Sequence, residues 1–455
     1  ITTRLVGSEM CIRDRLLFIS LGCDKNLVDT EFMLGMIRDA GTFDGQPIEM
    51  TDDEYQADII IINTCCFIND AKEESINTIL EMAEHKRDAK LKALIVTGCL
   101  AQRYKEEIRK EIPEVDAILG TNSYEDIVNA ITEALGGRFY ENFETLEGLP
   151  KLTAKRSVTT GGHFAYLKIA EGCNKRCTYC IIPFARGPLR SRSLDSIREE
   201  VGKLVAAGYK EVVLIGIHLG CYGKELAKEG KHVTLYDAVK AALSVEGVQR
   251  VRLGSLESVE VEPRMLQLMA EEPRLQRHLH LPLQSGCDKI LRAMHRPYDT
   301  KRFTELVNEI RAQVPDVAIT TDVIVGFPGE NEEDFATTLE FAKKCGFAKM
   351  HIFPYSKRKG TPAAEMPEQV DEAVKSERAA RLAKVDEELH QQMLQSTVGK
   401  VEEVLFEQPV DDEHMEGLCG PYLRVVVPGT AELANTIAKV KITGVKEDFL
   451  LGELN

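Results

Sequence analysis

The sequence has no apolar run long enough to cross a membrane. Hydrophobic residues make up 44% of the 455 residues, but no stretch approaches the ~18 consecutive apolar residues that a membrane-spanning helix needs, and no segment has the pattern of a signal peptide. The chain also lacks an excess of positive charge. Its net charge of −16 disfavours indiscriminate nucleic-acid binding, although it allows a local basic patch. We expect no membrane partner.

Cysteine, by contrast, is frequent, and its spacing argues against disulfides. Several of the twelve cysteines stand at the short intervals typical of metal ligands, and this pattern in a long chain indicates a reducing compartment. We therefore expect a cytoplasmic protein. At ~150 residues per domain, the length suggests about three domains. Residues 1–15, which include Cys11, have no initiator methionine and no clear periodicity, so we expect a non-native leader there.

The most informative motif is a group of three cysteines directly after the apolar stretch 164–170. Cys173, Cys177 and Cys180, here called the barrel triplet, form the pattern CxxxCxxC. Three thiolates can hold three irons of a [4Fe–4S] cube and leave the fourth iron open, whereas a cluster that only carries electrons normally takes four cysteines. S-adenosylmethionine (SAM) can chelate the open iron through its amino and carboxylate groups. A zinc knuckle or three unrelated buried thiols would be the alternatives.

Three further cysteines follow predicted parallel strands at 16–20, 59–63 and 93–97. Cys23, Cys65 and Cys99, here called the N-terminal triad, each come shortly after the end of one of these strands. The carboxyl ends of parallel strands meet at one edge of an open α/β sheet, so these thiols can converge. Helices that start after them would direct N–H groups at an anionic cluster. The alternative is three buried core cysteines. A structural role is expected for the remaining cysteines: Cys66, Cys221, Cys287, Cys345 and Cys419.

Periodicity divides the chain into an α/β part, a barrel and a β-rich tail. Residues 16–135 alternate apolar strands with amphipathic helices, which predicts a doubly wound, flavodoxin-like domain. After a glycine-containing linker at 136–163, residues 164–365 repeat a strand–helix unit. Six such strands predict an open, partial (βα)6 barrel with its functional groups at the carboxyl ends of the strands. A connecting helix is expected at 366–399 and a small β-barrel at 400–455.

Together these motifs resemble the radical SAM methylthiotransferases, from about Leu16 to the last residue. The resemblance implies that the barrel triplet holds a [4Fe–4S] cluster with SAM, that the N-terminal triad holds a second [4Fe–4S] cluster, and that the tail is a TRAM domain. It also implies the reaction. Reduction of SAM gives methionine and a 5′-deoxyadenosyl radical, which removes hydrogen from a substrate carbon, and that carbon then receives a methylsulfur group from the second cluster. A flavodoxin or ferredoxin would supply the electrons.

Strand ends of the barrel supply candidate contacts to SAM. The segment Val325, Gly326 and Phe327 ends a strand with a glycine that lets the backbone approach a ligand closely, and a similar segment lies against the adenine in radical SAM proteins. Ser255 and Glu257 follow another strand and could bond the ribose or methionine part. A plain loop-stabilising role is the alternative for these residues. No further residue can be assigned as catalytic.

The motifs are mixed with respect to substrate. Residues 20–30 and 97–104 resemble the RimO branch of the family, which modifies an aspartate of the small-subunit ribosomal protein uS12. Residues 184–188, 216–220 and 353–362 resemble the MtaB branch, which modifies N6-threonylcarbamoyladenosine next to the anticodon of tRNA. Because the barrel motifs cover more of the expected substrate contact, we predict tRNA as the substrate and keep uS12 as the alternative.

Charge gives conflicting indications about that substrate. Basic residues after barrel strands could contact phosphates, with a solvated charged rim as the alternative: Arg186, Arg190, Arg192, Lys357, Arg358 and Lys359. The tail from Lys400 onward, however, has five Lys or Arg against eleven Asp or Glu, a net charge of −6, which suits a basic ribosomal protein better. A single-cluster radical SAM methylase and a non-enzymatic iron–sulfur protein remain as rival interpretations.

Overall fold

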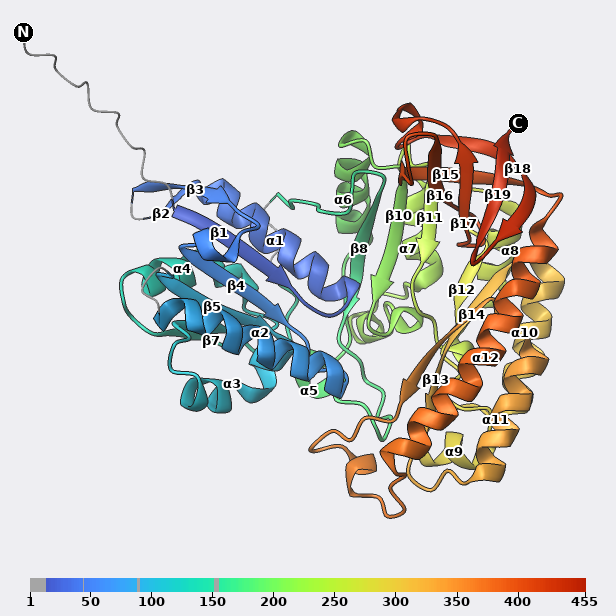
Figure 1. The fold of residues 1–455 in the computed structure, drawn as a ribbon, viewed down its shortest axis with the longest axis horizontal. Helices are drawn as coiled ribbons and strands as arrows, with labels where there is room; N and C mark the ends of the chain where they lie inside the picture. Colours follow the sequence, from blue (N-terminus) through green and yellow to red (C-terminus); the bar gives the residue numbers. More distant parts are fainter. Residues whose placement is uncertain (1–13, 44, 88–90, 151–154) are drawn as a thin grey trace, which may run out of the picture. The chain divides into compact units, whose positions relative to one another are not determined.

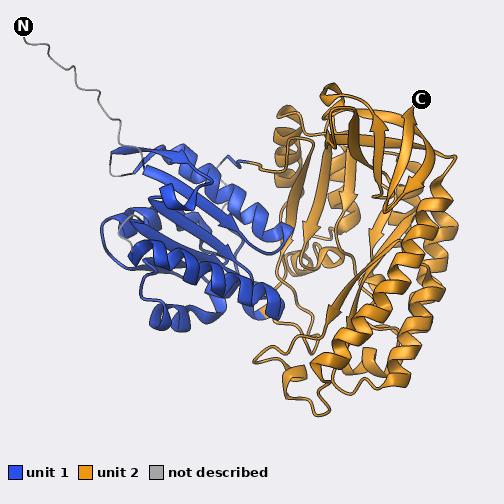
Figure 2. Ribbon diagram, in the orientation of Figure 1, with its two compact units in different colours: residues 1–157, 184–186 blue, residues 158–183, 187–455 orange. Residues whose placement is uncertain are grey.

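The computed structural model describes residues 14–43, 45–87, 91–150 and 155–455. The chain forms two compact units (Figure 2). Unit 1 comprises Ile1–Ser157 with Phe184–Arg186, and unit 2 comprises Val158–Pro183 with Gly187–Asn455. Most of the expected leader, including Cys11, lies outside the described residues. Its last two residues do not fit that expectation, because Asp14 and Arg15 begin the first strand. None of the described helices has the length and apolarity needed to span a bilayer.

Unit 1 is a seven-stranded sheet in the order β2-β3-β1-β4-β5-β6-β7, with helices packed on it (Figure 1). All strand pairs are parallel except β2 with β3. The two central strands β4 and β5 are buried at every position, as expected for a parallel sheet covered on both faces. This confirms the predicted flavodoxin-like layout. The elements are β1 (Asp14–Ser20), α1 (Asp24–Ala40), β2 (Thr42–Phe43), β3 (Gln46–Met50), β4 (Ile59–Thr64), α2 (Asn69–Arg87), β5 (Ala93–Gly98), α3 (Cys99–Glu111), β6 (Ala117–Leu119), α4 (Ile127–Leu135) and β7 (Tyr140–Asn142).

The predicted linker at 136–163 is partly a strand. Tyr140–Asn142 forms β7 and pairs with β6 at the edge of the unit 1 sheet. The strand has three residues, none of them buried, so the hydrophobic alternation that identifies strands in a sequence is missing here.

Unit 2 begins with the partial barrel, and all six predicted barrel strands are present. Hydrogen bonds order them as β11-β10-β8-β9 and β12-β13-β14, and isolated bridges such as Ser255↔His280 connect the two groups. The elements are β8 (Phe164–Glu171), α5 (Ile182–Arg186), β9 (Arg190–Ser191), α6 (Leu194–Ala206), β10 (Glu211–Gly216), α7 (Leu235–Leu243), β11 (Arg250–Leu253), α8 (Pro263–Glu271), β12 (His278–His280), α9 (Asp288–Ala293), α10 (Thr300–Gln313), β13 (Ala318–Val325), α11 (Glu332–Cys345) and β14 (Lys349–Pro354).

Alternation along the barrel strands separates an apolar face from a polar one. Leu279 of β12, Val323 of β13 and Met350 of β14 belong to one large hydrophobic core with the surrounding helices. Because successive strand residues point to opposite faces, their neighbours His280, Asp322 and His351 point into the barrel. The barrel interior is therefore lined by polar and ionisable groups.

A long helix and a closed β-barrel complete unit 2. Helix α12 (Glu372–Thr397) leads into a barrel with the strand order β15-β16-β17-β19-β18, which confirms the predicted β-rich tail. Strands β16 and β19 each carry a glycine and a glutamate among their apolar positions, so the hydrophobic alternation is interrupted in both. The strands are β15 (Val401–Pro409), β16 (His414–Cys419), β17 (Arg424–Pro428), β18 (Ile437–Lys446) and β19 (Phe449–Leu454).

Candidate functional site

The barrel triplet lies in a loop whose entry requires glycine. Gly172, which follows β8, has φ +70°, and a Cβ at this position would lie 1.9 Å from the carbonyl oxygen of Pro188. The backbone N–H of Cys173 then donates to the carbonyl of Gly187 at 3.0 Å. The sharp turn and the hydrogen bond fix the start of the cysteine loop at the carboxyl end of β8, where a barrel places its functional groups.

Each sulfur of the barrel triplet has an N–H donor. The amide of Lys175 donates to Sγ of Cys173 at 3.4 Å, and the amide of Ile182 donates to Sγ of Cys180 at 3.5 Å. The guanidinium of Arg296 reaches Sγ of Cys177 at 3.2 Å. Hydrogen bonds to ligating sulfurs favour the thiolate and tune an iron–sulfur cluster, so the residues present fit such a group.

Two thiols of the triplet, those of Cys173 and Cys180, need a cation to lose their protons. Burial, together with the charges of the other cysteines, raises the pKa of Cys173 to about 12 and that of Cys180 to about 11. A single Zn²⁺ would draw three thiolates to about 3.8 Å from one another. Among the described residues, two groups of metal-ligand side chains have donor atoms that all lie within 4.8 Å of one another. Neither group is the barrel triplet or the N-terminal triad.

Glu257 links this loop to two cations. Its carboxylate pairs with Arg296 at 2.5 Å and with Lys175 at 3.5 Å, and Glu257 is only 8% exposed. Arg296 therefore bridges Glu257 and Cys177. Glu257 can be proposed from its position after a strand, whereas Arg296 follows helix α9 and lies in no recognised motif, so no sequence pattern points to it. Ser255 forms a bridge to His280 of β12, which places it between the two strand groups of the barrel.

The segment Val325–Phe327 packs against the cysteine loop. Gly326 has φ +70°, and a Cβ there would lie 2.4 Å from Cγ of Lys375. Phe327 is fully buried, and its ring makes edge-type contacts with those of Tyr179 at 6.4 Å and Tyr355 at 5.3 Å between centroids. Tyr179 is part of the barrel triplet's own loop, and Cys177 and Cys180 pack against the same hydrophobic cluster as Phe327. The contact of this segment with SAM stays a prediction.

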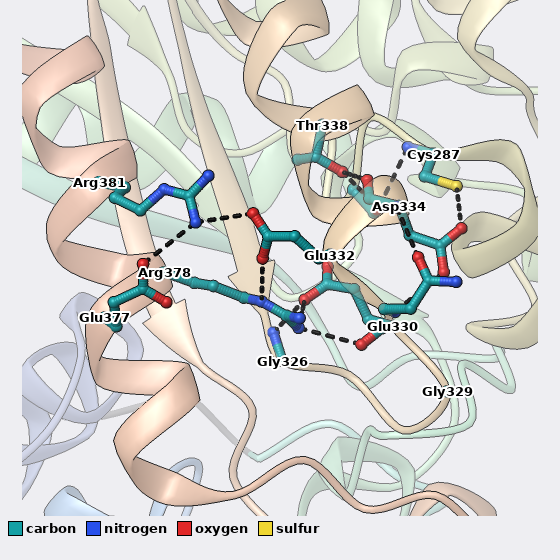
Figure 3. A network of polar contacts seen from close by, with 12 residues as sticks. Cys287, Gly326, Gly329, Glu330, Glu332, Asp334, Thr338, Glu377, Arg378 and Arg381 are labelled. Carbon is teal, nitrogen blue, oxygen red and sulfur yellow. Dashed lines mark hydrogen bonds and ion pairs between the residues drawn. The ribbon is translucent and has the colours of Figure 1, made fainter.

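A buried ion pair holds the Gly326 turn in place (Figure 3). The Glu330 carboxylate accepts from the amide of Gly326 at 2.6 Å and pairs with Arg378 of α12 at 2.9 Å. Burial raises the pKa of Glu330 to about 7, although the Gly326 amide and the Arg378 guanidinium both oppose this. The pair ties the candidate SAM segment to the long helix.

Replacing Arg378 with methionine should destabilise unit 2 by about 3 kcal/mol or more, since it leaves a buried carboxylate without its partner. With its pKa at about 7, the Glu330 carboxyl is mostly protonated in the folded state at about pH 6 and mostly ionised at about pH 8. The variant's loss of unfolding free energy should therefore be larger at about pH 8, where an ionised carboxylate has lost its partner. Denaturant unfolding at both pH values measures this.

Arg381→Met is the matched control. Arg381 lies on α12 like Arg378 and pairs with Glu332, but its side chain is 37% exposed. It should cost less than about 1 kcal/mol. The double variant Glu330→Gln/Arg378→Met should lose less than the sum of its single variants. Equal losses for Arg378 and Arg381 would contradict the role of the buried pair.

The N-terminal triad lies at the carboxyl edge of the unit 1 sheet. Cys23 directly precedes helix α1, Cys99 is the first residue of helix α3, and Cys65 follows β4. Gly22 leaves no room for a side chain, since a Cβ there would lie 2.9 Å from Sγ of Cys65. Burial and the charges of Cys99 and Cys23 raise the pKa of Cys65 to about 12. The fold thus brings Cys65 near enough to Cys23 and Cys99 for their charges to act on its thiol, and a shared cluster at this edge stays a prediction.

Cys66, for which only a structural role is expected from the sequence, lies beside this site. Its sulfur donates to the carbonyl of Cys99 at 3.3 Å, and burial together with the charges of Cys99 and Cys65 raises its pKa to about 12. Cys66 is therefore a neighbour of the triad. Cys221 also differs from its expected structural role, because its donor atom lies near those of His218 and Glu260.

Arg186 is part of the N-terminal triad's surroundings. It is 2% exposed, pairs with Asp29 at 2.9 Å, and donates from Nε to Sγ of Cys99 at 3.4 Å. It also donates to Asn26. A buried guanidinium beside thiols favours thiolates and a bound anionic cluster. This corrects the expectation that Arg186 binds substrate phosphates at a solvent-facing rim.

The expected cationic rim is also smaller than predicted. Arg190 and Arg192 are 7% and 6% exposed, and Arg358 is 8% exposed. The guanidinium of Arg192 pairs with Glu200, and that of Arg358 donates to the carbonyl of Tyr179 at 2.6 Å. These arginines are used inside unit 2, so Lys357 and Lys359 are the exposed members of the set.

Three known families match successive parts of the chain. Residues 15–120 match the uncharacterized protein family UPF0004, residues 167–342 match the radical SAM superfamily, and residues 395–454 match the TRAM domain. The TRAM match covers the closed β-barrel, and the radical SAM match includes the barrel triplet.

Solved structures support the fold alone. The radical SAM methyltransferase TsrM from Kitasatospora setae aligns with a TM-score of 0.52 at 12% identity, over 78% of this chain and 74% of that one. The cobalamin-dependent SAM radical enzyme OxsB aligns with a TM-score of 0.51 at 12% identity, over 84% of this chain. This chain spans 56% of the length of OxsB.

Curated relatives match nearly the whole chain and correct one expectation. A protein of Lachnoclostridium phytofermentans is 44% identical over 86% of this chain and 87% of its own length. A protein of Geotalea uraniireducens is 39% identical over 97% and 99%. Both are named ribosomal protein uS12 methylthiotransferase RimO, so the predicted tRNA substrate is wrong, since the barrel motifs that suggested it occur in a chain related to RimO throughout. The chain belongs to the radical SAM methylthiotransferase family and is a transferase that uses SAM and an iron–sulfur cluster.

Proposed function

We propose that this methylthiotransferase inserts a methylthio group at an unactivated C–H of an aspartate in the small-subunit ribosomal protein uS12. The observation that carries the proposal is the set of uS12 methylthiotransferases related to the chain at 36% to 44% identity over at least 86% of its length. A ribosomal substrate would place the enzyme in the cytoplasm, with a flavodoxin or ferredoxin as electron donor.

The charge of the TRAM barrel supports a protein substrate. Residues 400–455 carry a net charge of −6. The hairpin between β15 and β16 is exposed at Asp411, Asp412 and Glu413, and the turn before β19 is exposed at Glu447 and Asp448. An acidic surface attracts a basic ribosomal protein and repels the phosphate backbone of RNA.

The barrel triplet would hold the cluster that binds SAM, and together they would supply the one-electron chemistry that opens a C–H bond. The protein residues position and shield that site. Arg296 holds a positive charge at Sγ of Cys177, and Glu257 fixes Arg296. Phe327 and Tyr179 cover the loop with buried aromatic rings, which excludes water from reactive species.

The N-terminal triad would hold a second [4Fe–4S] cluster, on which the methylsulfur group is assembled. The charges of Cys99 and Cys23 act on the thiol of Cys65, which supports this, as does the guanidinium of Arg186 next to Cys99. The buried guanidinium of Arg186 would offset part of the negative charge of a thiolate-bound [4Fe–4S] cluster at this site.

The test is mass spectrometry of uS12 and of bulk tRNA from a strain that lacks the gene. Complementation with the wild-type gene should add the mass of one methylthio group to a uS12 aspartate, and complementation with a Cys177→Ala gene should not. A methylthio group that reappears on tRNA while uS12 stays unmodified would overturn the proposal.

A further inference from the structure

The barrel interior holds a cluster of ligand-type side chains away from both cysteine sets. His280 of β12, Asp322 of β13 and His351 of β14 offer two imidazoles and one carboxylate, with donor atoms all within 4.8 Å of one another. Asp322 stands directly opposite His351 in the β13–β14 register, and His280 stands opposite Thr320 in the β12–β13 register. The backbone of three paired strands therefore fixes the cluster.

We propose that His280, Asp322 and His351 form a binding site for a divalent transition-metal cation of the zinc class. Two imidazoles and one carboxylate are a donor set that Zn²⁺ takes in proteins, and three protein ligands leave a coordination position open. Ligand bonds of about 2.05 Å at tetrahedral angles place donors about 3.3 Å apart. His280 Nε2 and Asp322 Oδ1 are already 3.2 Å apart.

The histidines are prepared for ligation. Nδ1 of His280 lies 2.9 Å from Oγ1 of Thr320, which leaves Nε2 of His280 to face Asp322. A hydrogen bond on the other ring nitrogen is the usual support of a metal-bound histidine. The rings of His280 and His351 lie 5.6 Å apart between centroids.

The neighbouring charges distinguish this cluster from the other candidate. Cys221 and Glu260 of the group with His218 are both contacted by lysines: Lys224 lies 3.2 Å from Cys221, and Lys175 lies 3.4 Å from Glu260. These lysine ammonium groups supply the positive charge that a metal ion would otherwise bring to Cys221 and Glu260. In the described part of the chain, the ion pair found for Asp322 is with His280 and not with a lysine or arginine. His351 is exposed toward the barrel interior, so a cation has access.

The experiment measures zinc in the holoenzyme, because empty cluster cysteines would themselves bind Zn²⁺. Anaerobically reconstituted protein is dialysed against Zn²⁺, and iron and zinc are counted together by mass spectrometry. Wild type should hold one zinc per chain that dialysis against metal-free buffer removes slowly. Asp322→Asn and His351→Asn should lose that zinc while keeping their iron, and their thermal unfolding should no longer shift upward when zinc is added.

Two controls make the result decisive. His414→Asn removes a histidine that pairs with Asp411 on the exposed TRAM surface, and it should keep the zinc. Cys221→Ala tests the competing group and should also keep it. Zinc lost in Cys221→Ala, or retained in both Asp322→Asn and His351→Asn, would overturn the site. The readout does not depend on methylthio transfer, so it separates this inference from the proposed function.

Discussion

Replacing Cys177 with alanine is expected to abolish reductive cleavage of SAM. The barrel triplet supplies the protein ligands for its cluster, and a cube left with two thiolates should be lost or assembled poorly. Cys177 also accepts from Arg296, so its loss removes one acceptor of a guanidinium that Glu257 and Tyr298 still hold. Formation of 5′-deoxyadenosine under reducing conditions should fall at least about 100-fold, and the iron content should drop by about four per chain.

Cys287→Ala is the matched control for this prediction. Cys287 is a buried thiol in the same hydrophobic cluster that contacts Cys177 and Cys180, but its sulfur donates to Asp334. The variant should keep its iron and its SAM cleavage. If Cys177→Ala still forms 5′-deoxyadenosine at the wild-type rate, the assignment of the barrel triplet is wrong.

Both cysteine sets could be predicted from sequence, because one needs only the spacing within a short segment and the other only the strands that precede each cysteine. The spacing of Cys173, Cys177 and Cys180 is visible within eight residues. For the N-terminal triad, the argument needs only that parallel strands end at one edge. Both inferences use the chain direction and strand identity, which apolar periodicity reveals. The burial pattern of β4 and β5, apolar on both faces, is the same signal seen in the structure.

The arginines could not be placed from sequence because their partners are distant along the chain. Arg186 contacts Asp29 and Cys99, which are 157 and 87 residues away. Arg296 contacts Cys177 across 119 residues. From sequence, arginines near strand ends predict phosphate contacts, with a solvated rim as the alternative, since arginine is seldom fully buried unless paired. The pairing that permits burial is a property of the fold.

The metal-type cluster in the barrel needed strand register, which sequence does not supply. Alternation alone predicts that His280 and Asp322 face the same side of their strands. Whether Asp322 stands opposite His351 depends on the β13–β14 pairing, and a shift of one residue would turn the side chains apart.

Replacing Cys65 with alanine is expected to spare SAM cleavage and to eliminate sulfur insertion. Cys65 lies in unit 1, whereas the barrel triplet lies in unit 2, so its loss should leave the SAM-binding cluster intact. Under the proposal, the second cluster loses one of three ligands, and iron should fall from about eight to about four per chain. Mass spectrometry of uS12 should then find no methylthio group, while 5′-deoxyadenosine still forms.

The adjacent Cys66 makes this test specific. Both residues are buried, at 5% and 4% exposure, and burial raises the pKa of each thiol to about 12. Cys66→Ala therefore removes a thiol of matching environment that donates to the backbone of Cys99. It should retain both the iron and the methylthio product. Sulfur insertion that persists in Cys65→Ala, or that disappears equally in Cys66→Ala, would remove the assigned role of Cys65, because the proposed cluster requires the sulfur at that position and not merely a well-packed core.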